Sequence, residues 1–234
     1  MKEGIFMYYY GDSISTILII IGVLVTTFAS IFVNAMYSKY KKKDNHRGIS
    51  GFDVARSILD KHGLKDVLVL ETSGNLSDHY DPTKKVVKLS SDIFHGKTIA
   101  SIAVAAHECG HAIQDKENYS FLRLRAKIFP IVNLSSKLGY FAIMIGIFFG
   151  LTDLLWLGVA FELVILAFQL ITLPVEFDAS KRALSIIEKE AMVNNSEHKG
   201  AKTMLTSAAL TYVAGVLSAL FEILRLVLIA RDRD

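Results

Sequence analysis

The stretch AVAAHECGHAIQD, residues 103–115, carries two histidines four positions apart, with a glutamate directly after the first. Residues four apart on an α-helix are separated by about 40° around the axis, so His107 and His111 lie side by side on one face. Two imidazole nitrogens placed in this way reach one metal ion at about 2.0 Å each. Glu108 is rotated by about 100° and is expected beside the open coordination position, where it accepts a proton from a metal-bound water.

This pattern alone does not establish a metal site, because paired histidines on a helix are more often solvated or hydrogen-bonded. HExxH is expected by chance in a chain of this composition on the order of once in a hundred. Cys109, the one cysteine of the chain, points about 200° away from His107 and is expected to be a small buried core residue. A lone cysteine also excludes an intramolecular disulfide. The sequence therefore has to supply a third metal ligand elsewhere.

The composition indicates that part of the chain lies in lipid. Of the 234 residues, 52% are hydrophobic, and the mean hydropathy of +0.38 exceeds what a soluble globular protein needs. The net charge of +3, from 26 basic and 23 acidic residues, is too small to indicate a nucleic-acid partner. We therefore expect the lipid bilayer, and not nucleic acid, to be a partner.

Four apolar segments predict helices that cross about 30 Å of hydrocarbon. The first has no charged residue between Asp12 and Lys39, and it is expected to be an uncleaved anchor because its apolar run is too long for a signal peptide. The second and third, joined by a short turn, predict a hairpin. The three later segments are 131–151, 154–173 and 203–221.

The basic stretch YSKYKKKDNHRG, residues 37–48, directly follows the first span. By the positive-inside rule this end faces the cytoplasm, and Arg123, Arg125 and Lys127 place both outer ends of the hairpin on the same side. We expect a multi-pass protein of the bacterial inner (plasma) membrane with its site on the cytoplasmic side. A lysine-rich linker without topological meaning is the alternative.

The water-soluble region between the first two spans predicts a helix and a small sheet before the histidine helix. SGFDVARSILDKHGL, residues 50–64, has Ser50 as a cap and Gly63 as a stop signal. Apolar runs at 67–70 and 86–89 predict two or three short strands. We expect the strand at 86–89 to be an edge to which an extended peptide adds. The histidine helix is expected to begin near residues 97–98 and to end near Lys116.

The third ligand is sought in LPVEFDASKRALSIIEKE, residues 173–190, where the chain leaves the hairpin. Pro174 is expected in the first turn of a new helix, with Glu176 just inside it. The small residues on the Glu176 face allow a close approach to the histidine helix, and Glu176 is the expected ligand. The competing interpretation is that acids are simply favourable in a first turn. The alternative ligands are Asp178, Glu188 and His198, and Asp178 is expected rather to orient a histidine or to bind Arg182.

Three blocks in this order resemble the YugP-like family, proteins named as neutral zinc metallopeptidases of bacterial membranes, and more remotely the HtpX-like membrane proteases. The blocks are LSDHYDPTKKVVKLS (76–90), AVAAHECGHAIQD and LPVEFDASKRAL (173–184). The resemblance implies a Zn²⁺-dependent endopeptidase acting on protein or peptide substrates. It implies His107, His111 and Glu176 as ligands and Glu108 as the base. HtpX-like sequences commonly carry an aspartate four residues after the glutamate, where this chain has Ser180.

We therefore predict an α+β fold with a zincin-like (gluzincin-type) catalytic domain, a small sheet, the HExxH helix and about four transmembrane helices. The expected reaction is peptide-bond hydrolysis by a zinc-activated water, with a glutamate as base. The pattern specifies no oligomeric state. The predicted segments are an N-terminal anchor (1–38), the catalytic domain (39–128), the membrane hairpin (129–173), the helix with the third ligand (174–202) and a C-terminal span (203–234).

Several positions remain open at the level of the sequence. The donor that stabilises the tetrahedral oxyanion is sought among His79, Tyr80, Arg182 and His198. Two other functions are alternatives: a catalytically inactive zinc-binding adaptor, and a small metal-regulated membrane transport protein. The intact Glu108 argues against the adaptor, and four spans with short connections argue against transport.

The predicted membrane spans themselves carry ionisable residues. Glu162 lies midway along the third span, where a carboxylate is a candidate for function. A protonated or hydrogen-bonded role in helix packing, with Lys137 as a partner, is the alternative. Glu222 and Arg225, three residues apart near the end of the fourth span, are expected to pair.

Overall fold

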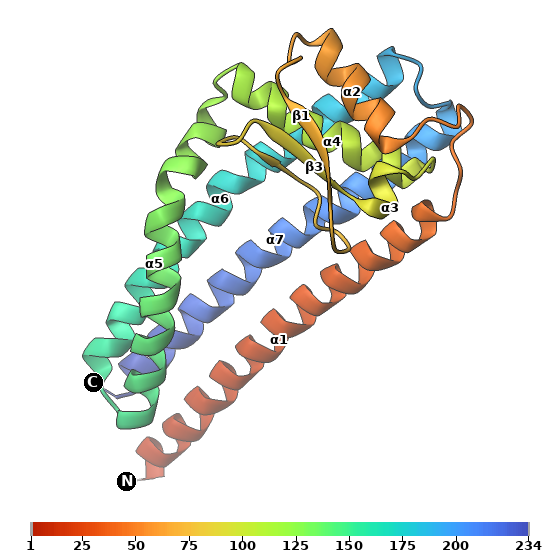
Figure 1. Ribbon diagram of the computed structural model, residues 1–234. Helices are drawn as coiled ribbons and strands as arrows, with labels where there is room; N and C mark the ends of the chain where they lie inside the picture. The colour runs from red at the N-terminus through yellow and green to blue at the C-terminus, as the bar shows by residue number, and fades with distance from the viewer. Residues whose placement is uncertain (1, 234) are drawn as a thin grey trace. The chain divides into compact units, whose positions relative to one another are not determined.

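The computed structural model describes residues 2–233, with side chains from residue 13 onward. It is mostly helical with one small mixed sheet (Figure 1), which confirms the α+β composition. The zincin-like fold stays a prediction. The elements are α1 (Lys2–Lys41), α2 (Gly51–Lys61), β1 (Leu68–Thr72), β2 (His79–Asp81), β3 (Val86–Ser90), α3 (Ser91–Phe94), α4 (Ile99–Lys116), α5 (Ser120–Phe149), α6 (Thr152–Lys189) and α7 (Asn195–Arg231).

The chain forms two compact units, and the long helices contribute to both. The first, here called the apolar unit, comprises Met1–Ser30, Leu124–Thr172 and Thr211–Asp234. The second, the α+β unit, comprises Ile31–Arg123 and Leu173–Leu210. The α+β unit contains the whole sheet and both sequence blocks that supply the predicted metal ligands.

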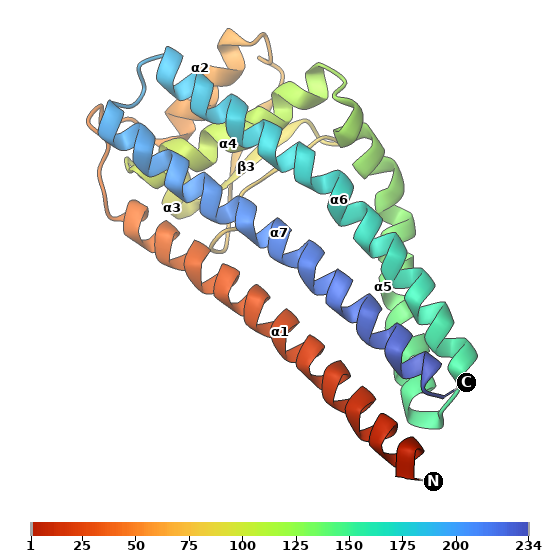
Figure 2. The ribbon, with the colours of Figure 1, turned by 180° about the vertical axis from the view of Figure 1, so that it is seen from behind.

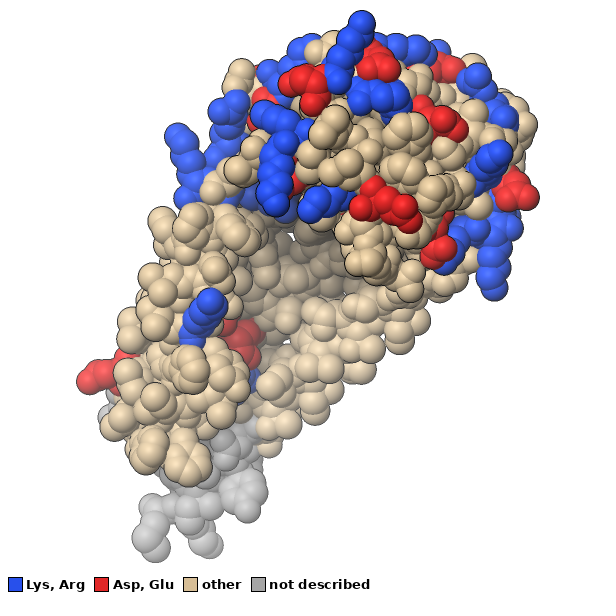
Figure 3. All heavy atoms as spheres, in the orientation of Figure 1, with Lys and Arg blue, Asp and Glu red and all other residues tan. Residues whose placement is uncertain are grey.

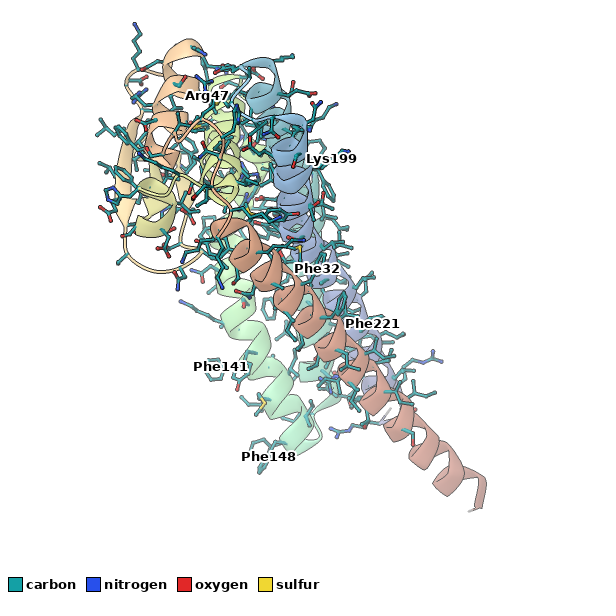
Figure 4. All side chains as sticks on the ribbon, turned by 90° about the vertical axis from the view of Figure 1, so that its right-hand side faces the viewer. Phe32, Arg47, Phe141, Phe148, Lys199 and Phe221 are labelled. Carbon is teal, nitrogen blue, oxygen red and sulfur yellow. The ribbon has the colours of Figure 1, made fainter. Side chains whose placement is uncertain are left out.

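The apolar unit consists of helices that are long and apolar enough to cross a membrane, four in the described part of the chain, as predicted. Its outer face is apolar: Phe141 and Phe148 on α5 point away from the neighbouring helices (Figure 4) and are 61% and 82% exposed. Few charged residues interrupt the face seen in Figure 3, whereas basic and acidic side chains cover the α+β unit. Such a surface is stable only against lipid or another apolar surface.

Two prolines lie inside long helices, although Pro174 was expected in the first turn of a new helix. Pro130 is within α5 and Pro174 is within α6, so the expected new helix at Pro174 is wrong. The break after the histidine helix falls at residues 117–119, where Asn118 has a positive φ of 56°. A proline removes one backbone hydrogen bond, but in an apolar segment every other backbone group still needs its helical partner, so the helix continues.

The sheet has the order β1-β3-β2, with β1 parallel and β2 antiparallel to β3. The expectation that residues 86–89 form an edge is therefore wrong, because β3 is paired on both sides. The alternation of apolar residues could not show this, since it identifies a buried face and not the neighbours of a strand. Val87 and Leu89 of β3 are fully buried, as suits a central strand. The free edges belong to β1 and β2.

Capping residues determine where α2 and α4, the two helices that border the core of the α+β unit, begin. Ser50 caps α2 in a capping box with Asp53, and Thr98 caps α4 by accepting a hydrogen bond from the Ser101 N–H. Both starts agree with the sequence prediction. Fully buried apolar side chains from α2, α4 and the sheet form one core, including Val54, Ile58, Leu59, Val87, Leu89 and Ile102. This core includes buried residues of α4 along the length that carries the histidines.

Candidate metal centre

His107 and His111 of α4 converge with Glu176 of α6 inside the α+β unit. The Nε2 atoms of His107 and His111 lie 3.3 Å and 3.6 Å from Oε2 of Glu176. One ligand atom of each residue lies within 4.8 Å of the other two. The expected pairing of two histidines on one helix face with Glu176 is therefore present in three dimensions.

The close approach of α4 and α6 depends on two small residues. A Cβ atom at Gly110 would lie 2.7 Å from the backbone oxygen of Ala179 and 3.2 Å from its Cα. Ala179 is fully buried at this crossing, and Figure 2 shows α6 passing across α4. Because no side chain separates the two backbones here, a carboxylate one turn before Ala179 reaches the histidines.

The orientation of His111 is fixed by Gln114, a residue that the sequence interpretation missed. The side-chain amide Nε2 of Gln114 donates to the backbone oxygen of Val175 and to Oδ2 of Asp178, each at 2.8 Å. The Oε1 atom of Gln114 is thereby left facing Nδ1 of His111 at 3.0 Å. An amide oxygen only accepts, so His111 carries its proton on Nδ1 and presents the lone pair of Nε2 to the site.

The same hydrogen bonds show how Asp178 is connected to His111. Asp178 also accepts from Nε of Arg182 at 2.5 Å, so the carboxylate acts on His111 through Gln114. The expectation that Asp178 orients a histidine or binds Arg182 agrees with both contacts. The signal that would have revealed Gln114 is its spacing of three from His111, on the same helix face.

His107 is held by Ser180, the residue found where the HtpX-like pattern has an aspartate. The Ser180 hydroxyl and Nδ1 of His107 share a hydrogen bond of 3.2 Å. As in His111, the contact at Nδ1 leaves the other ring nitrogen, Nε2 of His107, facing Glu176. A hydroxyl, which can donate to this nitrogen or accept from it, therefore contacts Nδ1 of His107.

The donor set fits a zinc ion. Zinc bound tetrahedrally at about 2.0–2.2 Å holds its ligand atoms roughly 3.4 Å from one another, close to the 3.3 Å and 3.6 Å that join the histidine nitrogens to Glu176. Two nitrogens and one oxygen form the kind of set that catalytic zinc sites use, with a fourth position open. The side chains are nearly enclosed, with exposed fractions of 16% for His107, 11% for His111 and 5% for Glu176.

Electrostatics around this group is shaped by burial. Glu108 is only 7% exposed, and burial raises the pKa of its carboxyl, while positive charge on the two histidines acts in the opposite direction. Burial lowers the pKa of His111, but the carboxylate of Glu176 outweighs it and the net shift is upward. Without a cation, only bound protons neutralise the negative charge of the two carboxylates that share this small volume with two imidazoles.

The other predicted site residues are not brought into the group. Nδ1 of His79 contacts the backbone oxygen of Ser77, Tyr80 donates to Asp115, and Arg182 binds Asp178 and Glu117. His198 lies 3.8 Å from Glu188, and neither belongs to the group of possible metal ligands found among the described residues. Cys109 is fully buried and points to the backbone oxygen of Ala55, as expected for a core residue.

Comparison with known proteins agrees with this geometry. A family model described as "Putative neutral zinc metallopeptidase" matches residues 15–231. The chain belongs to this family. The expected zinc cofactor is confirmed by the match to a zinc peptidase family and by a His/His/Glu group that could hold a metal.

One curated relative extends the match over most of the chain. It is named "Putative membrane protease YugP", from Bacillus subtilis (strain 168), and is 46% identical over 202 residues, which cover 86% of this chain and 90% of the relative. No solved structure matches the chain. The predicted family is thus confirmed, and together with the four apolar helices the relative supports a membrane location.

Proposed function

We propose that this protein is an integral membrane zinc metalloendopeptidase with His107, His111 and Glu176 as its metal ligands. The observation that carries the proposal is the convergence of three ligand atoms within 4.8 Å, next to the buried carboxylate of Glu108. Zinc, when bound, would polarise a water molecule and the scissile carbonyl. Residues 39–128 and 174–202 would form one zincin-like catalytic part, which is supported by the presence of residues 39–123 and 174–202 in the α+β unit.

Glu108 is assigned the role of general base. It accepts a proton as the water oxygen bonds to the scissile carbonyl carbon, and it delivers a proton to the amide nitrogen when the C–N bond breaks. Gln114 and Ser180 hold the two imidazoles so that neither Nδ1 competes for the site. Enclosure of the group excludes bulk water, which strengthens each of these interactions.

The peptide substrate is proposed to add as an extended strand to β2, which replaces the earlier assignment to residues 86–89. β2 is an edge of the sheet, and the Tyr80 hydroxyl donates to Asp115 of α4 at 2.8 Å, so this strand packs on the helix with the histidines. Main-chain hydrogen bonds along a free edge supply affinity without requiring a particular sequence.

The catalytic part is proposed to face the cytoplasm, which would make membrane and membrane-proximal cytoplasmic proteins the substrates. The support is the run of basic residues 39–47 directly after the apolar part of α1. A reporter fused after residue 43 tests the orientation, and an external signal there would contradict it.

The decisive experiment compares wild-type protein with Glu108→Gln, both purified in detergent, for zinc content and for hydrolysis of an unfolded protein. Zinc in both and cleavage by the wild type alone is the expected result, with a loss of rate of about 100- to 10,000-fold. Glu188→Gln, whose side chain is 68% exposed, is the matched control and should cleave normally. Zinc without cleavage in the wild type would favour the adaptor, and no zinc would refute the metal site.

A further inference from the structure

The apolar unit contains a cavity of about 450 Å³ between α1, α6 and α7. Its volume falls within the roughly 300–1,000 Å³ of ligand-binding pockets. The lining is partly polar, with Glu162 and Gln169 from α6 and Ser218 and Glu222 from α7. None of these residues takes part in the proposed hydrolysis, so the cavity calls for a different explanation.

The two carboxylates of the cavity lie well inside their helices, although Glu222 was expected near the end of the fourth span. Glu162 follows Asp153, near the start of α6, by nine residues, and Glu222 precedes Arg231, at the end of α7, by nine residues. At about 1.5 Å per residue, both are roughly 14 Å from the nearest helix end, half of the ~30 Å hydrocarbon thickness. A carboxylate at this depth is costly unless it has a partner.

The charges around the cavity do not balance. Glu222 is paired with Arg225, whose Nε donates to it at 2.8 Å. Among the side chains described in residues 13–233, Glu162 has no hydrogen bond or ion pair, and its charged neighbours are Glu222 and Arg225, not the expected Lys137. The buried Oε1 of Gln169 also lacks a hydrogen-bond partner within this set. Two unsatisfied acceptors and one excess negative charge favour a cation that carries N–H donors.

The cavity opens on the outer surface of the unit. Ile19 and Val23 of α1 line it and are 45% and 57% exposed, and Phe221 of α7, labelled in Figure 4, is also in the lining. Gly22 and Gly215 are also in the lining, where they face Ser218 and Gln169 of the protein itself. At mid-membrane depth no lipid headgroup supplies an amine, whereas a basic side chain on a spanning helix does.

We propose that this cavity binds a membrane-spanning helix of a substrate protein through one lysine or arginine near the middle of that helix. The inference rests on the proposed peptidase function and defines its substrate class. Glu162 and Gln169 bind the cationic group, and the incoming helix lies against the exposed side chains of Ile19 and Val23 at the mouth of the cavity. Substrates are thereby selected in the membrane, separately from the peptide segment that is cleaved.

Binding is tested with the Glu108→Gln protein in lipid vesicles, by energy transfer to labelled spanning peptides of about 20 apolar residues. The peptides are identical except for a central Lys, Leu or Glu. The Lys peptide should bind about tenfold more tightly than the Leu peptide, the order expected of a polar contact between helices in lipid, and the Glu peptide most weakly. Equal binding of the three peptides would overturn the proposal.

A second variant tests the residue assignment. Glu162→Gln, made in the same Glu108→Gln protein, should abolish the preference for Lys, whereas Asp153→Asn, on the same helix but outside the cavity, should retain it. A preference that survives Glu162→Gln contradicts the proposal. If Glu162→Gln does not fold, the binding of the Lys and Glu peptides to the protein that keeps Glu162 still shows whether the cavity prefers a cation.

The outcome is separable from that of the proposed function. Hydrolysis of an unfolded protein by the wild type, together with no preference among the peptides, would overturn the inference and leave the peptidase intact. A clear Lys preference in a protein that hydrolyses nothing would support the binding site and refute the peptidase.

Discussion

The His107–His111–Glu176 group of the α+β unit and the Glu162–Glu222–Arg225 group of the apolar unit both concentrate ionisable side chains in protected places, but they are supported differently. In the first group each histidine has a partner that orients it, Gln114 or Ser180. In the second, Arg225 satisfies Glu222, and Glu162 has no such partner among the described side chains.

The difference indicates two kinds of binding site. A metal site needs ligand atoms fixed to within a fraction of an ångström, because coordination distances are narrow, and hydrogen bonds behind the ligands provide this. A site for a basic side chain on a mobile helix needs charge and space rather than exact placement, so an unsupported carboxylate suffices. The predictions below test this contrast, beginning with the largest expected effect.

Replacing Glu176 with glutamine should remove zinc almost completely. The substitution keeps the shape but removes the one anionic ligand, and two neutral imidazoles alone bind zinc weakly. Metal analysis of the purified protein should show about one ion per chain in the wild type and far less in the variant. Glu188→Gln serves as the control and should keep its zinc. Full occupancy in Glu176→Gln would mean that another residue is the third ligand.

Replacing Gln114 with leucine should weaken zinc binding by about 10- to 100-fold, the range for residues that orient a ligand. The variant loses the contact that fixes the Nδ1 proton of His111. Competition with a chelator measures the affinity. As the control, Gln169→Leu removes the same kind of amide from the cavity of the apolar unit and should leave zinc affinity unchanged. Equal losses of zinc affinity in the two variants would show that Gln114 has no specific role in orienting His111.

Replacing Gly110 with alanine should separate α4 from α6. The new Cβ would meet the Ala179 backbone at 2.7 Å, and overpacking of this kind costs about 1–3 kcal/mol. Thermal unfolding should occur at a lower temperature, and zinc affinity should fall with it. Gly215→Ala, where the nearest atoms are 3.6 Å away, should be tolerated. Equal stability of the two variants would show that the close approach at Gly110 is not required.

The smallest effect concerns the capping box of α2. The hydroxyl and N–H of Ser50 lower the pKa of Asp53 in the folded protein, so this stabilisation is present above the ordinary pKa of about 3.9 and is lost as pH falls through the lower folded value. Asp53→Asn should cost about 0.5 kcal/mol at neutral pH, because the carboxylate is exposed.

Melting curves at several pH values test this expectation. The difference between wild type and Asp53→Asn should shrink below about pH 4, while zinc content at neutral pH stays equal. A difference that grows in acid would reverse the sign of the assigned pKa shift.

Much of this architecture was predictable because its signals are local. The span of α4, the caps Ser50 and Thr98, and the four long apolar helices follow from periodicity and composition over a few turns. The continuous helices through Pro130 and Pro174 were not predictable in this way, since the outcome depends on whether the surroundings offer water to a freed backbone group. The central place of β3 depended on which strands meet, and strand pairing joins residues distant in sequence.

The sequence by itself determined that two histidines share one face of a helix and that Glu108 follows on the same helix, because the helical repeat fixes the directions of neighbouring side chains. It also determined that much of the chain is apolar enough to cross a membrane. Only the tertiary structure decided which distant carboxylate meets the histidines, and that Gln114 and Ser180 orient them. The physical reason is that these contacts depend on how closely two helices approach, and the approach is set by Gly110 and Ala179 at one crossing.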